Sequence, residues 1–71
     1  MVNKFVYPKV AERISVKGIR VRELAEALDI SANEMGRKLR GENGLWLEEA
    51  IKIRRALGEE NMPLEKLFAK G

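Results

Sequence analysis

The sequence contains no cysteine, no histidine and no threonine, and its two serines stand at positions 15 and 31. The absence of cysteine and histidine excludes disulfides, the usual zinc sites, and nucleophile–base pairs that use either residue. The adjacent glutamates, Glu48-Glu49 and Glu59-Glu60, point in different directions on a helix and do not converge on a cation. We therefore expect a protein that is not an enzyme, with no metal site, no cofactor and no small-molecule substrate.

Long apolar runs are also lacking. None approaches the roughly 20 residues that a membrane-spanning helix needs, and Lys4 and Pro8 interrupt the apolar stretch that a signal peptide would require. The 71 residues, 45% of them hydrophobic, predict a single domain over residues 1–71 with one modest core. We expect a cytoplasmic protein that makes no contact with a membrane.

The net charge of +3 is unevenly distributed. Residues 13–41 carry seven bases and four acids, whereas residues 42–71 carry five bases and six acids. A basic surplus on one element is typical of proteins that bind polyanions. Charge alone favours the simpler interpretation of a solvated helix surface. Whether this element binds a polyanion must therefore be judged from the pattern of its residues.

Apolar spacing and helix-end signals predict an all-α domain of five short helices and no strand. Pro8 suits the first position of a helix that ends at Gly18, and Pro63 opens the last one. The fourth helix is apolar over the widest arc, so we expect it to be the most buried. Residues 1–6 are apolar without a clear period and fit an N-terminal arm, a short strand or a packing segment. The predicted helices cover about residues 8–17, 21–28, 32–40, 47–57 and 63–68.

The most informative stretch is residues 21–40, VRELAEALDISANEMGRKLR, where a tight break separates two short helices. Asp29 falls at the turn, where a left-handed backbone is often required and Asp is tolerated. Ser31 and Glu34 form a capping box, in which the hydroxyl accepts from the Glu34 amide and the carboxylate accepts from the Ser31 amide. Helices joined so tightly must cross steeply. One face of the second then projects outward, which is the helix-turn-helix geometry that fits a DNA major groove.

The residues of this stretch divide between core and surface. Asn33, Gly36, Arg37 and Arg40 fall on one face of the second helix, opposite its core-facing residues. A lone Trp46 between a loop and a helix is expected in the core, as are the other aromatic residues, Phe5, Tyr7 and Phe68. The crossing itself is expected to rest on Leu24, Ala25, Leu28, Ile30, Met35 and Leu39.

These residues together resemble the Cro/lambda-repressor-type (XRE-like) helix-turn-helix family, in particular its small phage and bacterial members. The resemblance rests on RELAEALDIS, on the helix ending KLRG, and on the later LEEAIKIRRALG and MPLEKLF. It extends from about Tyr7 to Phe68 and implies a lambda-repressor-like domain with a central helix-turn-helix. It also implies a transcriptional regulator, acting as a repressor, that binds double-stranded DNA sequence-specifically as a homodimer.

Residue by residue, the resemblance implies that four positions face base edges of the DNA: Ala32, Asn33, Gly36 and Arg37. Asn33 can make a bidentate contact with adenine, and Arg37 with guanine. Ala32 can touch a thymine methyl group or serve simply as a good first-turn residue. Gly36 can allow a close backbone approach to DNA or be a neutral replacement.

Phosphate contacts are expected from Arg20, Arg22, Lys38, Arg40 and Asn43. Arg20 and Arg22 stand at the start of a helix, where a cation is unfavourable with the helix dipole and destabilises the helix by about 0.3–1 kcal/mol each. Because this cost brings no folding benefit, phosphate contact is a reasonable explanation for their presence. Lys38 and Arg40 lie near the end of the recognition helix. Asn43, in the turn that follows, can donate to a phosphate.

The sequence departs from the family's pattern at several positions. Asp29 stands where a turn glycine is usual, and the helices beginning near Val21 and Leu47 lack Ser or Thr caps, each worth about 1 kcal/mol. Gly36 costs about 1 kcal/mol relative to Ala inside a helix. These departures keep open a second function: a protein-interaction module of the same fold, antirepressor or antitoxin-like, that does not read DNA specifically.

A homodimer needs a self-association surface, and the sequence offers two. The final helix carries Leu64, Leu67 and Phe68 on one face, and the N-terminal segment carries Phe5 and Val6. Either would have to set the two recognition helices about 34 Å apart, one turn of DNA. The sequence does not choose between the two surfaces.

Overall fold

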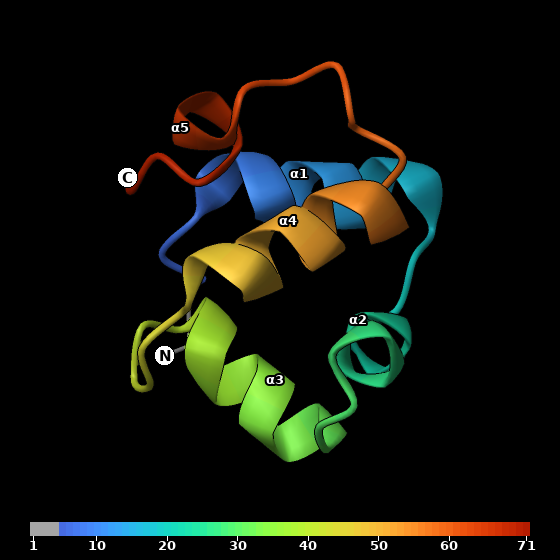
Figure 1. Ribbon diagram of the computed structural model, residues 1–71, viewed down its shortest axis with the longest axis vertical. Helices are drawn as coiled ribbons and strands as arrows, with labels where there is room; N and C mark the ends of the chain where they lie inside the picture. Colours follow the sequence, from blue (N-terminus) through green and yellow to red (C-terminus); the bar gives the residue numbers. More distant parts are fainter. Residues whose placement is uncertain (1–4) are drawn as a thin grey trace.

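The computed structural model describes residues 5–71, which form five helices and no strand. The all-α architecture is therefore confirmed, and the part of the predicted arm at residues 1–4 lies outside the described residues. Figure 1 shows α2 and α3 together at one end of the molecule and α5 beside α1 at the other, with α4 between them. The helices are α1 (Pro8–Lys17), α2 (Val21–Leu28), α3 (Ala32–Leu39), α4 (Leu47–Ala56) and α5 (Leu64–Leu67).

Local signals fix the ends of the first three helices. Pro8 opens α1, and Gly18 ends it in the left-handed conformation at φ 66°. Asp29 ends α2 at φ 60°, the one positive φ of a non-glycine residue within residues 5–71, as the turn position predicted. At the start of α3 the Ser31 hydroxyl accepts from the Glu34 amide at 3.1 Å. The predicted return bond from the Ser31 amide to the Glu34 carboxylate does not form among the described residues. Of the two bonds of the predicted capping box, the structure therefore has only the one accepted by Ser31.

The two helices without Ser or Thr caps differ from each other. α2 begins after Arg20 with no side-chain cap, as predicted. At the start of α4, by contrast, the Trp46 amide donates to Glu49 Oε1 at 3.0 Å. The N-cap residue Trp46 supplies no side-chain cap, as predicted, but a carboxylate from within the first turn satisfies the amide at the helix start.

The core draws most heavily on α2 and α3. Leu24, Met35 and Leu39 are fully buried, whereas Ile30 is partly buried against them. The prediction that α4 is the most buried helix is wrong: two of its residues are buried, against four in α3. Its first turn, with Leu47, extends into solvent. The buried apolar residues that pack together are Tyr7, Val10, Leu24, Ala25, Leu28, Met35, Leu39, Ile53, Leu57 and Leu67.

The residues at both ends of the described part of the chain pack on this core. Tyr7 is buried with its ring edge-on to Phe68, at a centroid distance of 5.4 Å and an interplanar angle of 77°. The Val6 amide donates to the Leu39 carbonyl at 2.9 Å, and the Val6 carbonyl accepts from the Gly71 amide at 3.2 Å. The residues just before α1 are therefore a packing segment. Within residues 5–71, no helix has the length and apolar character needed to cross a membrane.

The prediction that Trp46 lies in the core is wrong, because the residue is 72% exposed. It is the residue just before α4, with extended backbone at φ −82° and ψ 154°. Its amide is held by Glu49, and the extended backbone turns the ring out of the core. A lone aromatic residue at a helix start has no periodicity that indicates which way it points.

Candidate nucleic-acid interface

The crossing of α2 and α3 depends on the three-residue connection from Asp29 to Ser31. The Asp29 amide donates to the Glu26 carbonyl at 3.2 Å, and the Ile30 amide donates to the Ala25 carbonyl at 3.0 Å. These bonds close the end of α2 while the left-handed Asp29 reverses the chain. α3 therefore leaves at a fixed angle, because its capped start follows directly.

One side of α3 is exposed to solvent. Ala32, Asn33 and Arg37 are exposed, whereas Met35 is fully buried on the opposite side of the same helix. We call Ala32, Asn33 and Arg37 the α3 face. Glu34 is exposed beside them and adds one negative charge to this part of the surface.

Gly36 does not belong to the α3 face, because Arg40 covers it. Gly36 is buried, and a Cβ built on it would lie 3.1 Å from Arg40 Nη1. Arg40 in turn is half-buried and donates from Nε to Glu42 at 3.0 Å. The absence of a side chain at Gly36 lets the arginine lie back across the helix. This cover gives no support to the predicted role of Gly36 in contacting base edges, which stays a prediction.

Lys38 is likewise turned inward. It is 6% exposed, its Nζ donates to the Gly44 carbonyl at 2.9 Å, and it pairs with Glu49 at 3.2 Å. A buried ammonium requires such partners, because leaving it unpaired is costly. Lys38 therefore holds the loop after α3 against the start of α4, and its burial gives no support to the expected phosphate contact, which stays a prediction.

The other predicted phosphate contacts lie at the surface. Arg20 and Arg22 are exposed at the start of α2, and Asn43 is exposed in the loop after α3. Among the ion pairs of residues 5–71, none involves Arg20, Arg22 or Arg37. These three arginines on α2, α3 and the residue before α2 thus make no ion pair among the described residues.

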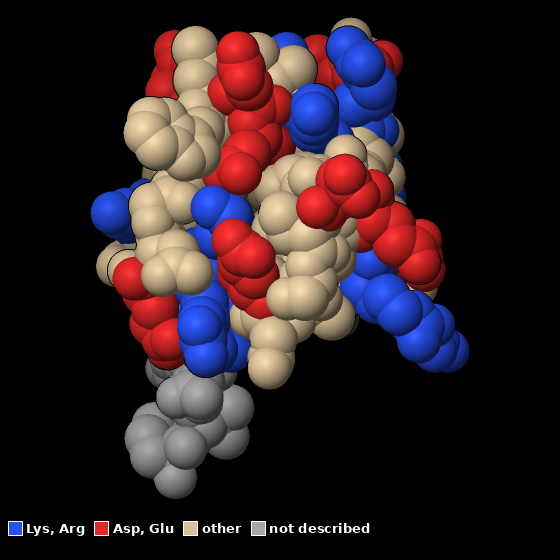
Figure 2. Space-filling view, turned by 60° about the horizontal axis from the view of Figure 1, so that its bottom comes forward, with Lys and Arg blue, Asp and Glu red and all other residues tan. Residues whose placement is uncertain are grey.

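The basic surplus of residues 13–41 is partly neutralised by folding. Arg13 and Lys17 pair with Glu59 at 3.5 and 2.9 Å, and Lys38 and Arg40 pair with Glu49 and Glu42. Those acids all come from residues 42–71, the acidic part of the sequence. Figure 2 shows Lys and Arg interspersed with Asp and Glu at the α2–α3 end, without a continuous basic area. Any attraction to a polyanion must therefore depend on a few individual contacts.

The Glu59 cluster has a structural role away from the α3 face. The hydrogen bond from Lys17 lowers the pKa of the Glu59 carboxyl below its ordinary value of 4.5, against the opposing effect of partial burial, and Arg13 adds to the lowering. Lys17 also donates to the Leu57 carbonyl at 2.7 Å. This cluster joins the end of α1 to the segment after α4.

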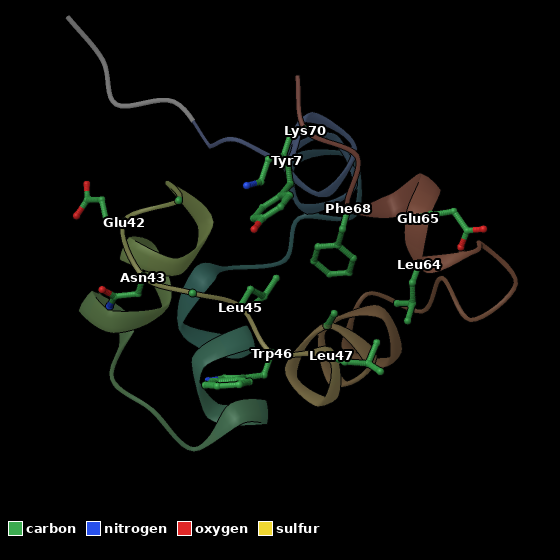
Figure 3. Close-up of a pocket in the computed structure, with 13 residues that line it drawn as sticks. Tyr7, Glu42, Asn43, Leu45, Trp46, Leu47, Leu64, Glu65, Phe68 and Lys70 are labelled. Carbon is green, nitrogen blue, oxygen red and sulfur yellow. The ribbon is translucent and has the colours of Figure 1, made fainter.

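A second exposed surface lies beside the start of α4 and was missed by sequence reasoning. Trp46 and Leu47, 72% and 67% exposed, border a groove of about 610 Å³ that α5 closes on the other side. Figure 3 shows Trp46, Leu47, Leu64 and Phe68 around this hollow, which we call the Trp46 groove. Leaving an indole this exposed forgoes about 3 kcal/mol of apolar burial. The sequence signal was the position of Trp46 outside any apolar stripe.

Comparison with known proteins assigns no role to these surfaces. No family model, curated protein or solved structure matches this chain. No group of three or more acidic, histidine or cysteine residues suited to a metal ion lies within residues 5–71. Function has to be inferred from the α3 face, from the exposed Arg20 and Arg22 at the start of α2, and from the Trp46 groove.

Proposed function

We propose that this protein binds double-stranded DNA in the cytoplasm as a transcriptional regulator of the Cro/lambda-repressor type, with α3 in the major groove. The observation that carries the proposal is the crossing of α2 and α3. The left-handed Asp29 and the Ser31 cap fix α3 so that Met35 is buried while Asn33 and Arg37 are exposed. A projecting helix of this kind matches the width of the major groove.

Base recognition in this proposal rests on two side chains. Asn33, in the first turn of α3, makes a bidentate contact with adenine, and Arg37, one turn later, makes one with guanine. Ala32 supports them by contact with a thymine methyl group. The free guanidinium of Arg37, outside the ion pairs of residues 5–71, favours this assignment.

Phosphate contacts come chiefly from Arg20 and Arg22, at the start of α2. Their location opposes the helix dipole, and their exposed, unpaired side chains suit a polyanion. Asn43 adds a neutral donor. Two charged contacts predict a salt slope, d log K/d log[salt], of about −2 for one protomer and about −4 for two.

Few contacts per protomer make a homodimer on paired half-sites part of the proposal. A single α3 with two base-reading side chains discriminates poorly among sequences, whereas two copies on one DNA face multiply that discrimination. Half-sites about 34 Å apart would match such an arrangement. Repression is the expected action, since a bound dimer blocks access to the DNA it covers.

A protein-interaction module of the same fold is the second candidate. The exposed Trp46 and Leu47, together with the interspersed charges in Figure 2, favour it. Such a module binds a protein partner tightly and retains duplex DNA only weakly and without sequence preference.

Selection of binding sites from random duplex DNA tests the proposal. The wild-type chain is expected to enrich a paired motif. Arg37→Ala should lose about 1–3 kcal/mol of base discrimination at one position of each half-site. Arg55→Ala, at a 73% exposed arginine on α4, is the matched control and should select the wild-type motif. No enrichment, together with no duplex binding at low salt and high protein concentration, would reject the proposal in favour of the second candidate.

A further inference from the structure

We propose that the Trp46 groove is a docking site for another protein, through a short segment that carries large apolar side chains flanked by Lys or Arg. The apolar side chains of this segment enter the hollow, and its cations lie against the acids at the rim. The inference goes beyond the proposed function, because it does not depend on DNA binding. It also states, in chemical terms, the partner of the second candidate function.

Apolar surface is concentrated at the start of α4. Trp46 and Leu47 are adjacent and both mostly exposed, whereas the remaining large exposed apolar side chain of the described residues, Val16, stands alone on α1. Adjacent exposed apolar groups mark interaction sites more often than scattered ones. Tryptophan is also enriched among the residues that dominate binding energy at protein interfaces. The start of α4 is therefore well suited to hold a partner.

The hollow beside these two residues has apolar walls. Leu45 and Phe68, both partly buried against the core, line it together with Leu64 of α5. Figure 3 shows Leu64 and Phe68 on the α5 side of the hollow and Trp46 on the other side. The volume of about 610 Å³ lies within the range of pockets that hold small organic molecules. It therefore suffices for one or two large side chains of a partner.

The segment that carries Trp46 is held in place from within the fold. Glu49 Oε1 accepts from the Trp46 amide at 3.0 Å and pairs with Lys38 Nζ at 3.2 Å. The same Nζ donates to the Gly44 carbonyl at 2.9 Å. The backbone on both sides of Leu45 is therefore anchored, so a partner that docks here has little backbone to order.

The rim of the hollow is mostly acidic. Glu42 and Glu65 line it against one lysine, Lys70, and Figure 3 shows the two glutamates on opposite sides of the hollow. Glu48 adds a further exposed acid in the first turn of α4. Glu48 and Glu65 make no ion pair among residues 5–71, and Glu42, paired with Arg40, keeps 53% of its side chain exposed. This rim is complementary to a partner with cations on both sides of an apolar centre.

Apolar walls within an acidic rim favour one occupant over the others. A nucleic acid would bring phosphates to the rim, where the carboxylates repel them. A second copy docked about a two-fold axis would bring the acids of the two rims together. A segment with apolar residues between Lys or Arg fills the hollow and neutralises the rim. One of its cations can also lie on the exposed face of the Trp46 indole, a contact worth about 0.5–1 kcal/mol at such sites.

The size of the Trp46 groove predicts weak binding. Interfaces of standard size bury roughly 800 Å² on each partner, and a hollow that admits one or two large side chains offers less. We therefore expect a dissociation constant on the order of 10 μM for a short segment. Because the acids at the rim are exposed, binding should weaken as the salt concentration rises.

Selection from a display library of short random peptides tests the proposal. The library is selected on immobilised wild-type protein and depleted on the Trp46→Ala variant, which removes peptides that bind elsewhere. The enriched peptides should combine neighbouring large apolar residues with Lys or Arg on both sides. Trp46 is the single tryptophan, so a synthetic enriched peptide without tryptophan should move the protein's emission to shorter wavelength as the indole leaves water.

Two pairs of variants test the walls and the rim separately, with the best enriched peptide as the probe. Leu47→Ala should weaken its binding roughly tenfold, whereas Val16→Ala, at a residue 66% exposed against 67% for Leu47, should leave it unchanged. Glu65→Gln should weaken binding about two- to fivefold, and less at high salt. Its control is Glu26→Gln, at an exposed acid of α2 outside the groove, which should have no effect. All four substitutions are at exposed positions, so the fold should be preserved.

Peptides enriched equally on wild type and on Trp46→Ala, or enriched peptides without basic residues, overturn the proposal. So does the absence of any enriched peptide, and so does a peptide-free chain that sediments as a dimer with its Trp46 emission moved, because a second copy then fills the groove. Duplex binding by the same chain is measured separately. Peptide binding without specific DNA binding leaves the groove standing and rejects the function, whereas specific DNA binding without peptide enrichment does the reverse.

Discussion

The α3 face and the residues at the end of α3 carry similar polar side chains and use them differently. On the α3 face, Asn33 and Arg37 extend into solvent. At the end of the helix, Lys38 is buried against the loop and α4, and Arg40, which follows the last residue of α3, lies over the helix and bonds Glu42. Lys38 donates to a backbone carbonyl of the loop that follows α3. A basic residue here is therefore free for another partner only where no neighbouring loop or acid engages it.

The largest expected effect comes from removing Lys38, the buried cation at the end of α3. Lys38→Met leaves the Glu49 carboxylate, 21% exposed, without its ion pair and the Gly44 carbonyl without its donor. The free energy of unfolding should fall by about 2–3 kcal/mol, as measured by urea denaturation. Lys52→Met, at an exposed lysine of α4, is the control and should change it by less than about 0.5 kcal/mol. Equal stabilities for the two variants would mean that Lys38 is not structural.

The next effect separates free from engaged arginines. Arg22→Ala should weaken binding to all duplexes by about 1 kcal/mol and make the salt slope shallower by about 1. Arg40→Ala should have a smaller effect, because this arginine is already paired with Glu42 and partly buried. Fluorescence anisotropy over a range of salt concentrations measures both. A larger loss for Arg40→Ala than for Arg22→Ala would contradict the distinction between free and engaged arginines.

A smaller effect tests why Arg40 lies where it does. Gly36→Ala places a Cβ 3.1 Å from Arg40 Nη1, the end of a flexible side chain that can shift. The gain in helix propensity, up to about 1 kcal/mol, should outweigh that shift and raise the melting temperature slightly. Gly18→Ala is the opposite case, because φ at Gly18 is 66°, and should destabilise by about 1 kcal/mol. Destabilisation by Gly36→Ala would show that Arg40 is held rigidly.

The smallest expected effect is on the pH dependence of stability and concerns Lys17 and Arg13, which pair with Glu59 away from α3. The pKa of Glu59 is lowered in the folded state, chiefly by Lys17, so its contribution to stability is present above the ordinary value of 4.5 and is lost as the pH falls through the folded value. Wild-type stability should therefore decline between about pH 5 and about pH 3 more steeply than that of Glu59→Gln. Glu65→Gln, at an exposed acid outside the ion pairs of residues 5–71, should keep the wild-type slope. Parallel curves for wild type and Glu59→Gln would contradict the assignment.

The features that sequence could predict are those decided within a few residues. Pro8 at a helix start, Asp29 in a left-handed turn and Ser31 as a cap each depend on the local backbone, and all three are confirmed. The burial of Met35 followed from apolar spacing. These local signals were sufficient for the number of helices and for the side of α3 that faces the core.

The errors concern residues whose placement depends on distant partners. Lys38 is buried because Glu49 lies in the next helix, and Gly36 is covered because Arg40 folds back toward it. Trp46 is exposed just before α4, where Glu49, three residues later, accepts a hydrogen bond from its amide. No periodicity in the sequence encodes these contacts, so the boundary between free and engaged cations required the tertiary structure.

The most direct test of DNA binding by the α3 face is an NMR titration of the isotopically labelled protein with a selected duplex. The largest amide shifts are predicted at Asn33 and Arg37, with smaller ones at Arg20 and Arg22 and none around Glu59. The Lys38 amide should move less than that of Arg37. Shifts confined to the Trp46 groove, or spread evenly over the surface with no maximum on the α3 face, would contradict DNA reading by α3.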